Sequence, residues 1–200
     1  MNNKNLYGIM IKYPEPGRVK TRLARDLGPE KAALICRQLT ERVMEQTVPV
    51  IGEYHRSVFY DPPERRQDFV SWLPNENFTA QKGSNIGERM DNAIRYLLEN
   101  GAEKAVITGA DIPDLANGII MQALKMLDHA DVAVGPARDG GYYLIGLKSP
   151  MPELFRNIHW STGDVFAETV SILKRSGKSF GVLPVLSDLD TIEDLAQIII

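Results

Sequence analysis

Apolar positions along the chain alternate between short continuous runs and longer stretches with helical spacing. The short runs are typical of buried strands, and we expect strands at Leu6–Ile11, Ser57–Tyr60, Lys104–Gly109, Asp131–Ala137, Tyr142–Leu147 and Phe180–Val185. The helical spacing predicts helices at Pro29–Met44, Asn85–Gly101, Asn117–Leu127, Asp164–Arg175 and Ile192–Ile200. Mixed signals between Phe69 and Ser84 predict a loop or irregular segment.

The order of these elements indicates an α/β fold. Strands that alternate with helices predict a largely parallel sheet that is covered by helices on both faces. The short turn Arg138–Gly141, with the sequence RDGG, is typical of a hairpin, so we expect one antiparallel strand at an edge of the sheet. The length of 200 residues, with no repeat or linker, predicts one domain over residues 1–200.

Composition narrows the class of protein. The hydrophobic fraction of 44 % and the charged fraction of 24 % are those of an ordinary globular protein, which argues against disorder. The net charge of −3 argues against general nucleic-acid binding, which needs a broad basic face. The one cysteine, Cys36, excludes an internal disulfide framework and favours the cytoplasm, and we expect it to be a small buried residue. No stretch has the length and apolarity of a membrane span, and the first apolar run is too short for a secretory signal.

A basic segment follows the first predicted strand. The stretch KYPEPGRVKTRLAR, residues 12–25, holds five basic residues and one acid. It is neither a Walker P-loop nor a dinucleotide fingerprint. Gly17 lets the backbone approach an anion, and Arg18, Lys20 and Arg22 could neutralise a diphosphate. The alternative is an ordinary solvated helix start. Lys12 and Arg25 are expected to be flanking surface charge.

Ligands in open α/β sheets bind beyond the carboxyl ends of the strands, and acidic residues also follow later predicted strands. Asp111, directly after the strand Lys104–Gly109, is a hard oxygen ligand suited to Mg²⁺ or Mn²⁺ beside a phosphate. Asp114 is better explained as part of a capped turn. Asp190 could be a second metal ligand, although Thr191 and Asp194 beside it resemble a capping box.

Two later segments leave structural and functional interpretations open. The glycines of RDGG suit a plain turn, or they let a substrate lie against the backbone while Asp139 or Tyr142 contacts it. In the segment HWSTGDV, residues 159–165, Ser161 and Thr162 are expected to cap a helix, and His159 and Trp160 either contact an acceptor or form a structural pair. The histidines have no matching nucleophile elbow, and no general base can be assigned.

Taken in order, six segments resemble a known family. They are PEPGRVKTRLA, GERM, TGADIPDL, VGPARDGGYYLIGL, HWSTGDV and DLDTIEDL, which span the chain from Ile9 to Leu195. They resemble a bacterial group of glycosyltransferase-A-like proteins, of the radical-SAM/selenodomain-associated transferase type, in the nucleotide-diphospho-sugar transferase superfamily. The resemblance implies a Rossmann-like three-layer α/β/α sandwich with a mixed, mostly parallel sheet, known as the GT-A fold.

The resemblance also implies roles for individual residues. The loop Gly17, Arg18, Lys20, Thr21 and Arg22 corresponds to the family's phosphate-binding loop. Asp111 corresponds to the metal carboxylate and Asp190 to a late aspartate that completes the metal site. We expect Lys20 and Asp111 to be the catalytic residues, with Mg²⁺ or Mn²⁺ as the cofactor. The acceptor is expected at Asp139, Gly140, Gly141 and Tyr142.

The expected function is a metal-dependent transferase that uses a nucleotide-activated donor. The donor is a nucleotide-sugar or an NTP, and the acceptor is an unidentified small molecule. The segment ADIPD is D-x-x-D rather than the D-x-D of glycosyltransferases, so a nucleotidyltransferase that joins an NMP to a phosphate-bearing acceptor is an alternative. A non-catalytic nucleotide-binding module is an alternative of another class.

Overall fold

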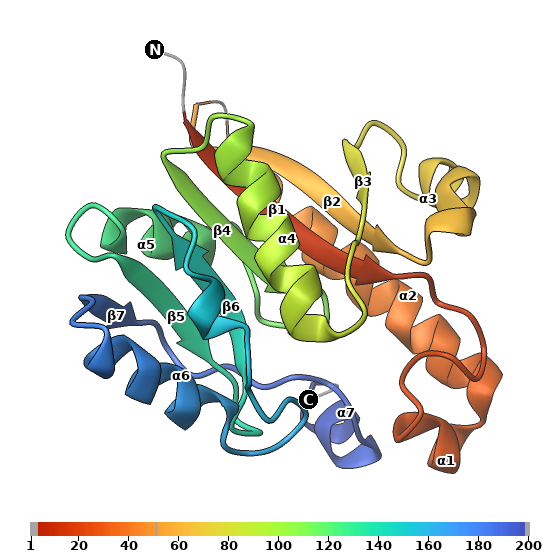
Figure 1. Cartoon of the computed structure of the whole chain (residues 1–200). Helices are drawn as coiled ribbons and strands as arrows, with labels where there is room; N and C mark the ends of the chain where they lie inside the picture. The colour runs from red at the N-terminus through yellow and green to blue at the C-terminus, as the bar shows by residue number, and fades with distance from the viewer. Residues whose placement is uncertain (1–3, 51, 199–200) are drawn as a thin grey trace.

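A seven-stranded sheet runs through the part of the chain that the computed structural model describes, residues 4–50 and 52–198 (Figure 1). The order across the sheet is β3-β2-β1-β4-β6-β5-β7. The strands are β1 (Asn5–Lys12), β2 (His55–Asp61), β3 (Phe78–Ala80), β4 (Lys104–Gly109), β5 (Val132–Pro136), β6 (Tyr142–Leu147) and β7 (Phe180–Val182). The predicted α/β fold with a mixed, mostly parallel sheet is confirmed.

One strand runs against the others. β6 pairs antiparallel with both β4 and β5, while the other neighbouring strands are parallel. The prediction of a hairpin at RDGG is therefore correct, but its placement at an edge is wrong. The hairpin returns β6 into the space between β4 and β5, where both faces are covered. As a result, the carboxyl ends of β1, β4 and β5 and the start of β6 share one edge of the sheet.

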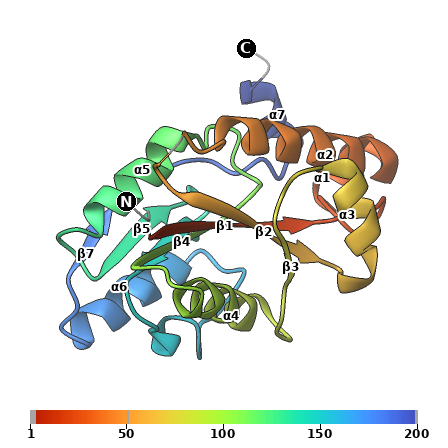
Figure 2. The same cartoon turned by 90° about the horizontal axis from the view of Figure 1, so that it is seen from above.

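Helices cover both faces of the sheet, as the view from above shows (Figure 2). α2 and α5 lie on one face, and α4 and α6 lie on the other. The helices are α1 (Leu23–Leu27), α2 (Pro29–Gln46), α3 (Arg66–Trp72), α4 (Ile86–Glu99), α5 (Asn117–Met126), α6 (Val165–Arg175) and α7 (Ile192–Ile198), with short 3₁₀ turns η1 (Pro63–Arg65) and η2 (Pro152–Leu154). Residues 199–200 of the last predicted helix lie outside the described residues.

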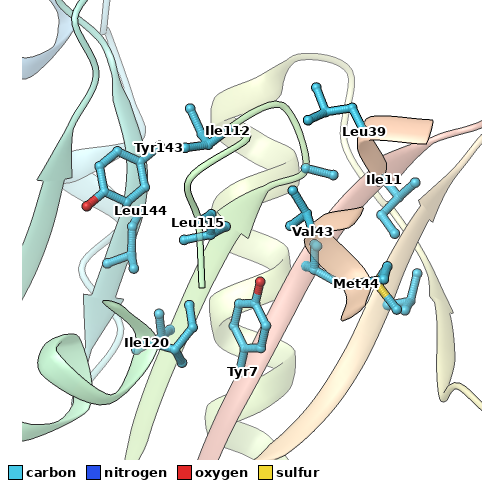
Figure 3. Close-up of a cluster of buried hydrophobic side chains, with 14 of the residues drawn as sticks. Tyr7, Ile11, Leu39, Val43, Met44, Ile112, Leu115, Ile120, Tyr143 and Leu144 are labelled. Carbon is cyan, nitrogen blue, oxygen red and sulfur yellow. The ribbon is translucent and has the colours of Figure 1, made fainter. Parts of the chain in front are cut away.

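Each face of the sheet has its own core because successive strand residues point to opposite sides. In β1, Tyr7 and Ile11 belong to the core on the α2 and α5 side, and Figure 3 shows them on the same side as Val43 of α2. Met10 packs instead against the core on the α4 and α6 side. Cys36 of α2 is buried, as predicted.

The segment between Phe69 and Ser84 is more ordered than its sequence predicts. It contains most of α3 and the three-residue strand β3. Phe69 is fully buried, with ring centroids 5.2 Å from Tyr60 and 6.2 Å from Phe78. These aromatic contacts join α3, β2 and β3. Such short elements carry little periodicity, so tertiary packing rather than local pattern decides them.

Two predicted helix caps have different outcomes. Thr191 and Asp194 form the expected reciprocal cap at α7, since Thr191 N donates to Asp194 Oδ2 at 2.8 Å and Asp194 N donates to Thr191 Oγ1 at 3.3 Å. The prediction that Ser161 and Thr162 cap α6 is wrong, because the residue at the cap position is Asp164. Within the described residues, no helix is long and apolar enough to cross a membrane.

Candidate functional site

Three segments far apart in the sequence meet at the carboxyl edge of the sheet. The loop after β1 carries Lys20, the loop after β4 carries Asp111, and the segment before α7 carries Asp190. The two acidic segments are joined by their backbones, since Leu189 N donates to Asp111 O at 3.0 Å. Parallel β1 and β4 are neighbours, so the loops that leave them emerge side by side.

The ammonium group of Lys20 lies between the two carboxylates. Lys20 Nζ is 2.7 Å from Asp111 Oδ1 and 3.0 Å from Asp190 Oδ1. The Lys20 side chain is only 4 % exposed, whereas the Asp111 side chain is 57 % and the Asp190 side chain 36 % exposed. Burial alone would lower the pKa of Lys20, but the two carboxylates outweigh it and raise that pKa above its ordinary value. The site therefore holds one buried cation beneath two accessible anions.

The backbone of the basic loop directs Lys20 inward. Lys20 has a φ of 45°, in the left-handed region that non-glycine residues seldom occupy. Such a conformation persists only where surrounding contacts maintain it, and strained residues of this kind gather at functional sites. The two ion pairs of Lys20 are contacts of that kind.

The other predicted residues of this loop are more exposed. Arg22 Nη1 lies 3.7 Å from Asp190 Oδ2, and Arg18 Nε lies 3.7 Å from Glu15 Oε2. Gly17 and Thr21 are exposed and do not line the cavity described next. The structure thus brings Lys20, Asp111 and Asp190 together, with Arg22 at their margin.

A cavity of about 570 Å³ opens beside this cluster at the carboxyl edge of the sheet. Its charged lining residues are Lys12, Arg18, Lys20, Asp61, Arg89, Asp111, Asp139 and Asp190. Volumes of this size are typical of small-molecule sites. The lining also includes Lys12, whose expected role was that of flanking surface charge.

The β5–β6 hairpin contributes three of the four residues that were expected to meet an acceptor. Asp139, Gly141 and Tyr142 line the cavity, and Gly140 does not. Asp139 Oδ1 accepts a hydrogen bond of 2.9 Å from Gly141 N. Position 140 requires glycine for a structural reason. The φ of Gly140 is 90°, and a Cβ there would lie 2.0 Å from the carbonyl oxygen of Gly163.

The donor set is compatible with a divalent metal that is partly held by its substrate. Asp111 and Asp190 converge on one point, and each has a second carboxylate oxygen that is not bonded to Lys20. Over the described residues, no group of three or more His, Cys, Asp or Glu side chains is arranged to hold a metal by itself. Mg²⁺ commonly binds through one or two carboxylates plus phosphate oxygens, so the pair fits that mode of binding.

Several lining residues were not singled out from the sequence. Arg89 of α4 pairs with Asp61 at 3.1 Å, and its Nε donates to Gly83 O at 3.2 Å. Asp61 ends β2, so the rule that found Asp111 could also have found it. Arg89 lies in a helix, and only the packing of α4 against the sheet brings it to the cavity.

Asp188 lies near two of the acidic lining residues. Its burial, followed by the charges of Asp139 and Asp190, raises the pKa of Asp188 above its ordinary value.

The residues of segment 159–165 divide between the cavity and the surface. Trp160, Ser161, Thr162 and Val165 line the cavity, but His159 does not. His159 Nδ1 lies 2.6 Å from Glu168 Oε1, and its side chain is largely exposed. His159 therefore has a local partner on α6.

The sheet order, the helices on both faces and the position of the cavity define a nucleotide-diphospho-sugar transferase-like fold. The chain belongs to the family described as an uncharacterized protein conserved in bacteria, DUF2064, whose model matches residues 44–162. No curated protein matches it.

Solved structures agree with this class. A protein of Desulfovibrio desulfuricans G20, described as a candidate nucleotide-diphospho-sugar transferase, is 36 % identical with a TM-score of 0.91, covering 98 % of this chain and 86 % of its own. A CMP:2-keto-3-deoxy-manno-octonic acid synthetase in complex with CTP is 14 % identical with a TM-score of 0.60, over 98 % and 96 % of the two chains. A Mycobacterium tuberculosis H37Rv protein in complex with manganese is 16 % identical with a TM-score of 0.50, over 96 % of both chains. The last two similarities are evidence for the fold alone.

Proposed function

We propose that this protein is a metal-dependent transferase that acts on a nucleotide-activated donor, with a nucleotide-sugar as the favoured donor. The observation that carries the proposal is the buried ammonium of Lys20 between Asp111 and Asp190 at the mouth of a cavity of about 570 Å³. The proposal is supported by the position of this cation and these two carboxylates, which lie at the edge of the sheet where α/β folds bind nucleotides. The 36 % identical relative, described as a candidate nucleotide-diphospho-sugar transferase, supports the same class.

The basic loop supplies positive charge for the departing diphosphate. Lys20 and Arg18 line the cavity, and Arg22 lies at its margin beside Asp190. Fixed cations aimed at the oxygens where negative charge develops lower the barrier without having to reorganise during the reaction. Arginine adds the option of paired hydrogen bonds to phosphate oxygens.

Asp111 and Asp190 would hold Mg²⁺ or Mn²⁺ through the carboxylate oxygens that Lys20 leaves accessible. When bound, such an ion neutralises diphosphate charge and orients the leaving group. The acceptor would enter next to Asp139, Gly141 and Tyr142, on the hairpin side of the cavity. Asp139 then lies where it can accept a hydrogen bond from an acceptor hydroxyl.

A second candidate is nucleotidyl transfer from an NTP to a phosphate-bearing acceptor. The observation that favours it is the D-x-x-D spacing of Asp111 and Asp114, since Asp114 is exposed and does not line the cavity. Asp111 therefore acts without a neighbouring carboxylate from its own loop. The synthetase in complex with CTP, which shares the fold at 14 % identity, is an example of this fold with a bound NTP.

The decisive experiment incubates the protein with a panel of nucleotide-sugars and NTPs, with and without Mn²⁺, and identifies the products. Release of a nucleoside diphosphate from a nucleotide-sugar supports glycosyl transfer, and release of pyrophosphate from an NTP supports nucleotidyl transfer. Binding of nucleotides without any turnover would instead make the protein a nucleotide-binding module.

The residue assignment is tested with a matched pair of variants. Asp111→Asn should abolish metal-dependent turnover, because it removes a charged ligand at the cavity. Asp114→Asn is the control, three residues away on an exposed part of the same loop, and should retain full turnover. Unchanged turnover in Asp111→Asn would refute the site.

A further inference from the structure

The cavity has two halves of opposite character. The charged half, defined by Lys20, Asp111, Asp139 and Asp190, lies at the edge of the sheet. The other half, here called the apolar half, has the apolar lining residues Met10, Ile86, Met90, Tyr142, Trp160 and Val165. The ion pair of Arg89 and Asp61 and the side chains of Ser161 and Thr162 line the cavity beside them. The apolar side chains come from β1, α4, β6, the segment before α6 and the first residue of α6, on the α4 side of the sheet. Nothing in the chemistry of a diphosphate or a divalent metal requires this second half.

The wall of the apolar half is continuous. The rings of Tyr142 and Trp160 pack edge to face with centroids 6.2 Å apart, and Tyr142 Oη lies 3.8 Å from Met90 Sδ. Trp160 also packs directly on α4, since a Cβ at Gly87 would lie 2.6 Å from Trp160 Nε1. The absence of a side chain at Gly87 lets the indole lie against the helix and form a side of the cavity.

The apolar half is open to solvent rather than filled. Ile86, the first residue of α4, is 44 % exposed, and Met10, Tyr142 and Trp160 are only partly buried. Exposed apolar side chains gathered in a concave site beside polar groups are typical of ligand-binding surfaces. Water makes few favourable contacts with these side chains. A bound apolar group would remove their surface from water, which is favourable.

One polar atom in this half lacks an oxygen or nitrogen partner. Among the described residues, the hydrogen-bond partner of the Tyr142 hydroxyl is the weakly accepting sulfur of Met90. Burial raises the pKa of this phenol, so the group stays a neutral donor. A ligand oxygen would be a stronger acceptor for it than the sulfur.

We propose that the apolar half binds the body of the acceptor, which carries an aromatic or compact aliphatic group next to its reacting oxygen. This inference rests on the proposed function and names the acceptor class for it. Tyr142 connects the two halves, because it follows the turn that carries Asp139 and also forms part of the apolar wall. An acceptor bound against Tyr142 therefore reaches the charged half.

Trp160 provides a direct probe of this site. The chain has two tryptophans, and Trp72 lies away from the cavity in α3. A Trp72→Phe variant therefore reports Trp160 fluorescence alone. We would titrate it with 4-bromobenzyl alcohol, a heavy-atom quencher with an apolar ring, and with 3-bromo-1,2-propanediol as the polar quencher. The first should quench with saturation, and the second should quench only by collision, without saturation.

The matched variants are Ile86→Glu and Leu34→Glu, each in the Trp72→Phe background. Glutamate is tolerated at Ile86 because a negative charge in the first turn of a helix is favourable. Leu34, on α2, is 54 % exposed and outside the cavity. Ile86→Glu should raise the half-saturation concentration of 4-bromobenzyl alcohol at least about fivefold, and Leu34→Glu should leave it within about twofold.

Other outcomes overturn the inference. Equal saturation by both quenchers, absence of saturation by the aromatic alcohol, or an unchanged half-saturation in Ile86→Glu would each exclude an apolar subsite. Once the donor is known, benzyl alcohol should accelerate its consumption over the rate in water alone, and a lack of effect would refute the acceptor assignment. Failure of the proposed function is distinguishable, since it would abolish donor turnover and leave the saturable quenching intact.

Discussion

Among the described residues, Lys20 and Arg56 are both buried cations that pair with carboxylates. The two sites differ in how exposed those carboxylates are. Arg56 pairs with Glu76 and also donates to Met44 O at 2.5 Å and Thr47 Oγ1 at 3.2 Å. The Arg56 and Glu76 side chains are 7 % and 18 % exposed, so both members of that pair are enclosed. The two carboxylates that contact Lys20 are instead open to the cavity.

We interpret this difference as that between a structural ion pair and the proposed functional one. An enclosed pair has no room to exchange partners, and its role is to satisfy buried charges. In the proposed function, the carboxylates above Lys20 bind another cation and Lys20 then contacts an anion. Burial of the cation is thus similar in both places, and the accessibility of the anion distinguishes them. The following predictions test this comparison.

The largest effect is expected for the enclosed pair. Arg56→Met should lower the free energy of unfolding by about 3–5 kcal/mol, because it leaves Glu76 buried without its partner. Urea denaturation measures this value. Arg65→Met removes a more exposed cation, paired with Asp68 at 3.1 Å, and should lower the free energy of unfolding much less than Arg56→Met does. Donor turnover per folded molecule should stay unchanged in Arg56→Met, and a selective loss of turnover would contradict its structural role.

The next effect concerns catalysis at Lys20. Lys20→Met should reduce kcat by about 10²–10³-fold, because the charge on the departing diphosphate loses its buried cation. Steady-state kinetics with a donor that the panel of nucleotide-sugars and NTPs shows to be turned over measures the change. Arg25→Met, in the same basic segment but outside the cavity, should retain kcat. If both variants lose activity equally, the effect is one of general surface charge and the comparison fails.

The third prediction concerns the affinity for metal, which Lys20→Met should increase although it lowers kcat. In the absence of nucleotide, Lys20→Met should bind Mn²⁺ about tenfold more tightly than the unchanged protein, because the ammonium no longer competes for Asp111 and Asp190. Electron paramagnetic resonance of free Mn²⁺ measures the affinity. Asp190→Asn should weaken binding instead. Equal or weaker binding by Lys20→Met would show that the two carboxylates do not form the metal site.

The smallest effect concerns an exposed pair, His159 and Glu168. The hydrogen bond and the charge of Glu168 raise the pKa of His159 above its ordinary value. The pair therefore adds stability that is fully present below the ordinary histidine pKa and is lost as the pH rises through the raised one. NMR titration should show that Glu168→Gln lowers the pKa of His159. Because His159 lies outside the cavity, donor turnover should not follow this titration.

Most of the fold could be predicted from local pattern. The strands β1, β4, β5 and β6 and the helix α4 lie where the apolar spacing places them, because long periodic segments have one face or both faces in a core. The position of β6 could not be predicted, since a hairpin turn defines a partner strand but says nothing of the strand on its other side. The elements α3 and β3 were missed because their order comes from the packing of Phe69.

The candidate site was predicted in part. The rule that ligands bind at the carboxyl ends of strands selected Lys20, Asp111, Asp139 and Asp190, and the structure brings all four to one cavity. The same rule overlooked Asp61, at the end of β2. Arg89 and Ile86 lie in a helix, where no strand-end rule applies, so only the tertiary structure reveals them.

By itself the sequence determined the succession of strands and helices and the identity of the charged residues that follow the strands. These follow from side-chain periodicity and from turn residues, which act over a few neighbouring positions. The tertiary structure decided which cation of the basic loop is buried, because Lys20 meets carboxylates that lie 91 and 170 positions later in the chain. It also decided that an apolar half adjoins the charged one, since that half is built where α4, β6 and the Trp160 segment pack together.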